Sequence, residues 1–186
     1  MSYYGNEYER RTLMNIEALY FQKYFYFKHL NQSSSEHRVT YWVKLSRDIE
    51  LHRLMYALLD VVQNQPVLRT QFVTDDFNQL KINLRDFFPF IEIKEVNEMS
   101  QSIDLEAFFT RNLNSYHFNQ LPLFNFKIYQ FLDDAYLLLD FHATIFNESQ
   151  LTPFLQQLNI AYTHSLKSEY SISDFYNWIK EMNQKM

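Results

Sequence analysis

Residues 136–147 read YLLLDFHATIFN, a stretch in which a run of apolar residues leads to a single histidine. The apolar run that opens it predicts a buried β-strand, which ends on a single histidine, His142. An imidazole at a strand end can face a cleft, and its ordinary pKa of about 6.5 suits proton transfer. His142 is therefore the candidate catalytic residue.

The overall composition is that of one globular domain. The chain has 186 residues, which fits a single domain and is enough to bury a core. Hydrophobic residues make up 47% of it, with 14 Tyr and 18 Phe, so disorder is not expected. The net charge of -5 gives no electrostatic reason to bind nucleic acid or an anionic membrane, and neither partner is expected.

The absence of cysteine and the near absence of glycine exclude several kinds of functional site. The chain has no cysteine, which excludes disulfides and thiolate nucleophiles and is compatible with the cytoplasm. Gly5 is the only glycine, whereas a Walker loop, a dinucleotide fingerprint and a nucleophile elbow all need several. With no signal peptide and no apolar run of about 18 residues, we expect a soluble cytoplasmic protein.

Strand and helix patterns alternate along the whole chain. Strands are expected over residues 39–45, 67–73, 79–84, 90–96, 123–131 and 136–141. Helices are expected over residues 13–30, 48–62, 102–116, 152–166 and 174–185. Asp48 and Thr152 are the expected N-caps of the second and fourth helices, with Pro153 at the first helical position. A polar loop at residues 31–36 is the clearest break, and no linker divides residues 1–186, so one sheet covered by helices is predicted.

Short motifs along the chain carry a family resemblance. LYFQKYFYF, residues 19–27, resembles S-x-A-Q-x-R-L-W at Gln22 and at the aromatic positions. NQPVLRTQF, residues 64–72, resembles R-H-E-x-L-R-T-x-F and has its Leu68, Arg69, Thr70 and Phe72. The remaining segments are HFNQLPLF at 117–124, FHATIFN at 141–147 and DFYNW at 174–178, which resemble F-D-L-x-x-x-P-L, H-H-x-x-x-D-G and D-F-A-V-W.

In this order and spacing, the segments resemble the amino-terminal half of a condensation domain of nonribosomal peptide synthetases, in the chloramphenicol-acetyltransferase-like superfamily. The resemblance implies an α/β fold, a two-layer sandwich in which a mixed β-sheet is covered by helices. It also implies that residues 1–186 form the first of two lobes, because every motif of the second lobe is absent from the sequence.

The resemblance assigns roles within that family. The two lobes of a condensation domain enclose a tunnel, which receives the phosphopantetheine arms of donor and acceptor carrier proteins. By position, the part played by the second histidine of the motif, a general base or a group that orients the acceptor amine, falls on His142. Phosphopantetheine would then be carried by partner proteins, and no cofactor is expected to bind this chain directly.

The motif around His142 departs from the family pattern at two positions. Phe146 replaces an aspartate that pairs with an arginine, and Asn147 replaces a glycine that lets the loop lie close to the substrate. The loop is therefore either reshaped or idle. Arg69 has two interpretations, the orphaned partner of the lost aspartate or a structural arginine that bonds carbonyls and surface acids.

Structural interpretations stand beside the functional ones. His142 could be a hydrogen-bonded histidine with no chemical role. The other histidines lack metal-ligand spacing, so no metal site is expected at His29, His37, His52, His117 or His164.

Other conspicuous side chains have structural explanations as well. Asp133 and Asp134 are expected to form a solvated turn. The aromatic residues of 20–27 are expected to be buried on more than one side of their helix, although an exposed remnant would mark an interface. Trp178 is expected to anchor the last helix to the sheet.

The expected function is a partial condensation domain at the start of a peptide synthetase, a structural or docking lobe against a downstream adenylation domain. Its partners would be the adenylation and peptidyl carrier domains of the same synthetase, in secondary metabolite biosynthesis. Two enzyme alternatives remain open. The chain could be half of an active amide-forming enzyme whose second lobe is removed or supplied in trans, or an acyltransferase that self-associates, for instance as a homodimer.

Overall fold

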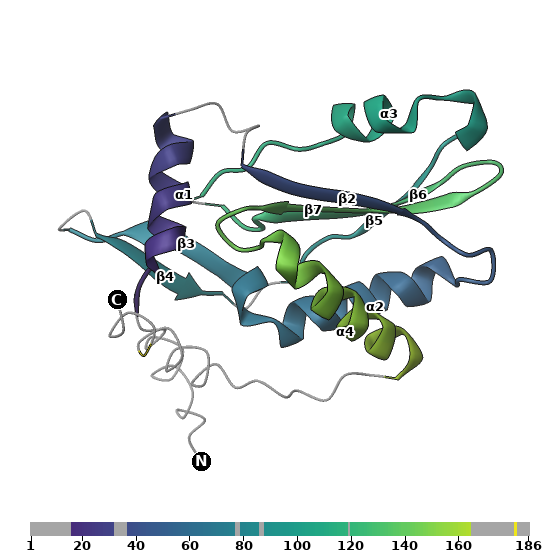
Figure 1. Cartoon of the computed structure of the whole chain (residues 1–186). Coiled ribbons are helices and arrows are strands. Elements are labelled where there is room, and N and C mark those ends of the chain that lie inside the picture. Colours follow the sequence, from purple (N-terminus) through teal and green to yellow (C-terminus); the bar gives the residue numbers. More distant parts are fainter. Residues whose placement is uncertain are drawn as a thin grey trace, which may run out of the picture.

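The computed structural model of the chain describes residues 16–31, 37–76, 79–85, 88–118, 120–164 and 181. Its centre is a four-stranded sheet with the strand order β2-β7-β6-β5 (Figure 1). The strands are β2 (Arg38–Lys44), β7 (Ala135–His142), β6 (Phe124–Gln130) and β5 (Glu92–Glu95). β7 is antiparallel to β2 and β6, whereas β5 is parallel to β6, so the sheet is mixed as predicted.

A smaller antiparallel sheet has the order β1-β4-β3. It consists of β1 (Ile16–Glu17), β4 (Leu80–Leu84) and β3 (Thr70–Thr74). The strand predicted at 67–73 was wrong in its first half, because Pro66 opens a 3-10 helix, η3 (Pro66–Arg69), before β3 begins. The long helix predicted at 13–30 was also wrong in its first part, since β1 pairs with β4 and the helix begins only at Tyr20.

Helices cover both faces of the larger sheet (Figure 1). α2 (Leu51–Asn64) and α4 (Leu151–Thr163) pack together on one face, and α3 (Leu105–Arg111) lies over the other. The alternation of side chains along β7 follows from this arrangement. Its odd-numbered residues Leu137, Leu139 and Phe141 join the core of α2 and α4, whereas Leu138 joins a smaller core with Phe109 of α3.

The predicted helix starts were displaced. α2 follows Glu50, and Asp48 does not cap it. α3 begins later than predicted because the Asp104 carboxylate accepts the N–H of Ala107 at 3.1 Å and fixes its start, and it ends at Arg111, before the predicted end at 116. α4 begins at Leu151, one residue before the expected cap Thr152, because a 3-10 helix, η5 (Glu148–Gln150), leads into it. The helix predicted at 174–185, with Trp178, and the loop at 31–36 lie outside the described residues except for 31 and 181.

Helix α1 (Tyr20–Asn31) lies beside the smaller sheet (Figure 1). Tyr20 is 71% exposed and Tyr24 52%, whereas the polar Gln22 is only 2% exposed. The Gln22 side chain accepts the N–H of Leu19 at 3.0 Å, which explains its burial at the start of the helix. The prediction that these aromatic residues are buried on more than one side was therefore wrong, because the buried face of α1 is partly polar and the exposed face is apolar.

Candidate functional site

His142 is the last residue of β7, and its side chain is completely buried. The strand directs it away from the α2–α4 core, onto the sheet face that also carries Asp140. Three aromatic rings surround its imidazole. The ring centroids of Phe118, His29 and Tyr116 lie 4.7, 5.2 and 5.6 Å from that of His142.

Both ring nitrogens of His142 have partners inside the protein. Nδ1 accepts the backbone N–H of Thr144 at 3.1 Å and lies 2.7 Å from the Thr144 hydroxyl oxygen. Because a backbone N–H can only donate, Nδ1 must hold a lone pair and the proton of the neutral ring is on Nε2. Nε2 lies 3.4 Å from Nδ1 of His29, to which it donates. The basic nitrogen of His142 therefore faces its own backbone and not an open cleft.

The surroundings of His142 also keep the ring uncharged. Burial lowers its pKa to about 3, and electrostatic interactions with His29, His37 and Arg38 act in the same direction, because each of these groups disfavours a second positive charge nearby. The pKa of His29 is lowered as well, by partial burial and by the nearby His37 and His117. At neutral pH the pair is thus a hydrogen bond between two neutral rings.

A buried carboxylate, Asp140, lies two residues before His142 on the same sheet face, and sequence analysis did not identify it as part of the site. The Tyr116 hydroxyl donates to it at 2.6 Å and the Thr40 hydroxyl at 2.8 Å. The Arg38 guanidinium lies 3.4 Å from the same carboxylate and 4.5 Å from the centroid of the Tyr116 ring. The available signal was an aspartate inside the apolar run YLLLDF, which a buried strand tolerates only when the charge is paired.

This network holds the segment after α3 over the site. Arg38 also donates to the carbonyl oxygen of Asn114, and Tyr116 is itself buried. Burial raises the pKa of the Asp140 carboxyl, while the hydrogen bond from Tyr116 and the charge of Arg38 act in the opposite direction. Because Arg38 and Asp140 bind this segment, Tyr116 and Phe118 are held against the sheet face and cover His142.

The loop after His142 carries Phe146 and Asn147 at the two positions where it departs from the motif that it resembles. Phe146 is buried, and its ring stacks on Phe141 at a centroid distance of 3.7 Å and an interplanar angle of 5°. Asn147 has an extended backbone with φ of -131° and accepts the N–H of Ser149 at 3.0 Å, while its own N–H donates to Gln150 at 2.8 Å. The position of the family's aspartate is therefore part of the hydrophobic core, and that of the glycine is a cap of η5.

Arg69, which the matched segment singled out, is buried at the end of η3. The residue at the position of the family's aspartate is Phe146, so no carboxylate stands there. The structure therefore keeps the arginine of the resemblance in a buried position, while an aromatic ring stands where the family has its aspartate.

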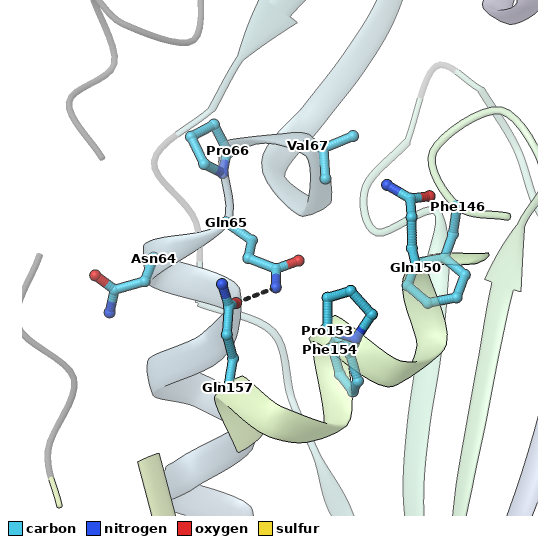
Figure 2. Close-up of a pocket in the computed structure, with 9 residues that line it drawn as sticks. All are labelled: Asn64, Gln65, Pro66, Val67, Phe146, Gln150, Pro153, Phe154 and Gln157. Atoms are coloured by element: carbon cyan, nitrogen blue, oxygen red, sulfur yellow. Dashed lines mark hydrogen bonds between the residues drawn. The ribbon is translucent and has the colours of Figure 1, made fainter. Parts of the chain in front are cut away.

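A cavity of about 260 Å³ lies beside this loop, between the end of α2 and the start of α4 (Figure 2). Gln65 and Gln157 hydrogen-bond across it. Phe146 and Phe154 form apolar walls and belong to the α2–α4 core, on the opposite sheet face from His142. The full lining comprises Asn64, Gln65, Pro66, Val67, Phe146, Gln150, Pro153, Phe154 and Gln157. His142 does not line this cavity.

The other residues considered as functional candidates, the histidines and the Asp133–Asp134 pair, show no arrangement for chemistry among the described residues. Among the described residues no group of three or more His, Asp or Glu could hold a metal ion. The turn of Asp133 and Asp134 is not simply solvated as predicted, because Ser100 donates its N–H to Asp133 at 2.6 Å and Lys44 lies 2.7 Å from Asp134.

No helix in the described part of the chain is long and apolar enough to span a membrane.

Comparison with known proteins gives a family match over most of the chain. The condensation domain model matches residues 15–186. No curated protein matches. The starter condensation domain of rhizomide synthetase RzmA has the same fold, with a TM-score of 0.75 and 13% identity over 91% of this chain and 43% of that one.

Two further solved structures agree. The first condensation domain of the CDA synthetase gives a TM-score of 0.74 and 10% identity, over 90% of this chain and 45% of that one. The X-domain from teicoplanin biosynthesis gives a TM-score of 0.73 and 15% identity, over 92% of this chain and 39% of that one. The chain thus spans less than half the length of these relatives. Together with the mixed sheet and its helices, the match over residues 15–186 places this chain in the condensation domain family.

Proposed function

We propose that this chain is the first lobe of a nonribosomal peptide synthetase condensation domain, and that it has a structural or docking role and does not form amide bonds by itself. The observation that carries the proposal is the state of His142, a neutral, fully buried ring whose two nitrogens are both engaged within the chain. A general base must instead offer its lone pair to the proton that it removes.

The size of the catalytic effects supports the same conclusion. Holding two tethered substrates at reaction distance can contribute roughly 7 to 11 kcal/mol, whereas one general base typically adds about 10²–10⁴-fold. The chain spans 43% of the length of a solved condensation domain and would form one wall of the tunnel between lobes. A histidine on one wall does not compensate for the missing wall.

The docking role is supported by the outward face of α1. Tyr20, Tyr24 and Phe27 are exposed and follow i, i+4, i+7 spacing, so they form one apolar stripe. Surface apolar residues that gather in a patch are typical of protein interfaces. We assign this stripe to contact with a neighbouring domain of the synthetase, an adenylation domain, with phosphopantetheine delivered by carrier domains, in the cytoplasm.

The enzyme alternative has one structural requirement. Half of an active condensation enzyme, completed by a second lobe, needs His29 and the cover of Tyr116 and Phe118 to move away from His142. Substrate could then reach the imidazole. A self-associating acyltransferase has the same requirement.

The test is the full-length synthetase with His142→Ala. We expect unchanged product output, with His52→Ala, an exposed histidine of α2, as the matched control. Loss of product by a hundredfold or more, with adenylation activity and soluble expression unchanged, would show that His142 does chemistry. His142→Phe, which keeps an aromatic ring in the buried site, separates loss of packing from loss of the imidazole.

A further inference from the structure

Strand β2 is an outer strand of the four-stranded sheet, and within the described residues β7 is its one strand partner. The hydrogen bonds between β2 and β7 fix which backbone groups of β2 point outward. The N–H of Leu45 donates to Ala135 at 2.8 Å and the carbonyl of His37 accepts from Ala143 at 2.9 Å, so odd-numbered residues face β7. The even-numbered residues of β2 therefore direct their N–H and C=O groups toward the open side.

The middle of this edge lacks the features by which proteins usually block strand addition, and its charged residues stand only at the two ends, Arg38 and Lys44. It has no proline, and its middle residues, 39–43, are β-branched or aromatic, with Trp42 42% exposed and Val43 40% exposed. Each of its two cations pairs with a carboxylate of the same chain, although the Lys44 side chain is itself 57% exposed. Arg38 pairs with Asp140 at 3.4 Å, and Lys44 pairs with Asp134 at 2.7 Å.

The sequence of the edge is nearly palindromic. Residues 39–43 read VTYWV, so a two-fold axis through Tyr41 places Val39 opposite Val43 of a second copy. The same axis places Thr40 opposite Trp42, and both residues direct their backbone groups outward. A two-fold interface requires a surface that is complementary to itself, and this strand meets that requirement in both side chains and hydrogen bonds.

We propose that two copies of the chain pair through β2 in antiparallel register about Tyr41, which joins their four-stranded sheets into one. At each end of the shared ladder Arg38 faces Lys44 of the other copy. Each cation keeps the carboxylate of its own chain, Arg38 with Asp140 and Lys44 with Asp134. The charges at each end of the ladder are therefore balanced. The pairing is independent of the function proposed for His142.

Single-cysteine variants test the register directly, because the chain has no cysteine of its own. Tyr41→Cys places two thiols at a pair that is not hydrogen-bonded, where Cα atoms are about 4.5 Å apart and a disulfide forms without strain. Val39→Cys is the matched control on the same strand face. Its own copies would be separated by roughly 14 Å, beyond the roughly 7 Å limit for a disulfide.

Under mild oxidation we expect Tyr41→Cys to give covalent dimers and Val39→Cys alone to give none. A mixture of Val39→Cys with Val43→Cys should give the mixed dimer. Equal cross-linking of Val39→Cys alone, or none with Tyr41→Cys, would overturn the proposal.

Sedimentation supplies a second measurement that does not depend on cysteine. Val43→Lys introduces a charge at a half-exposed position, and we expect it to weaken dimerisation at least tenfold. Ile160→Lys, a similarly exposed apolar residue on α4, should leave the dimer unchanged. A wild-type chain that remains monomeric at high concentration, or equal effects of both substitutions, would contradict pairing through β2.

Discussion

The Nε2 atom of His142 lies 3.4 Å from the Nδ1 atom of His29, and this contact joins the end of β7 to helix α1. Thr144 donates its N–H to the other nitrogen of His142, so the Nε2 proton is the one shared between the rings. The bond requires His29 to be neutral as well, because its Nδ1 must accept. The strand end is thus attached to α1 by a contact that protonation removes.

Stability should therefore fall in acid. The folded-state pKa values of His142 and His29 are both lowered, so the fold favours the neutral rings. For basic groups with depressed pKa values this contribution is complete above about pH 6.5 and is lost as pH falls toward about 3. We expect unfolding by urea to show a loss of about 2 kcal/mol between pH 7 and pH 5.

Substitution of His142 tests whether this residue causes the loss of stability in acid. His142→Asn should flatten the dependence of the free energy of unfolding on pH, because Asn does not titrate. His52→Asn, which removes an exposed histidine of α2, is the matched control. A wild-type slope that survives His142→Asn would place the titrating group elsewhere.

Removing the buried charge of Asp140 should destabilise the fold. Asp140→Asn leaves the Arg38 side chain, 13% exposed, without its carboxylate and disturbs the acceptors of Tyr116 and Thr40. Breaking one side of such a pair costs about 3 kcal/mol or more. Denaturant unfolding measures the loss, and Asp48→Asn, at an exposed site, should change it by less than about 0.5 kcal/mol. Similar values for the two variants would show that the network contributes little.

Restoring the family's acidic residue should not restore the family's loop. Phe146→Asp places a carboxylate where a ring now stacks on Phe141, so it removes packing and buries a charge. We expect it to cost more than Phe146→Ala, which itself should cost about 3 to 5 kcal/mol. Thermal or denaturant unfolding compares them. A more stable Asp variant would mean that buried Arg69 reaches the new carboxylate and that the ion-paired loop can re-form.

The apolar stripe of α1 should carry the docking role. Tyr24→Glu introduces a charge at its centre and should weaken binding to the adenylation domain at least tenfold, measured by calorimetry. Tyr56→Glu on α2 is the matched control, since Tyr56 is 66% exposed and Tyr24 is 52% exposed. Equal affinities of the two variants would remove α1 from the interface.

Local pattern was enough to predict the two strands of the central hairpin. The apolar runs that became β6 and β7 were recognised because they lie on either side of Asp133 and Asp134, a polar turn that joins two strands into a hairpin. The same reasoning failed at α1, whose helical sequence is aromatic all round. Periodicity cannot indicate which side of such a helix is buried, and the structure exposes Tyr20 and Tyr24 while it buries Gln22.

The sequence by itself determined the family, the mixed α/β fold and the candidate His142, because motif order and strand pattern are local properties of the chain. Only the tertiary structure decided what surrounds that histidine. His29 and Asp140 act on the site through contacts that join α1, β2 and the segment after α3, and one of them spans 113 positions of the sequence. The tautomer follows from Thr144, two residues away, but burial and pKa depend on these long-range neighbours, which no motif records.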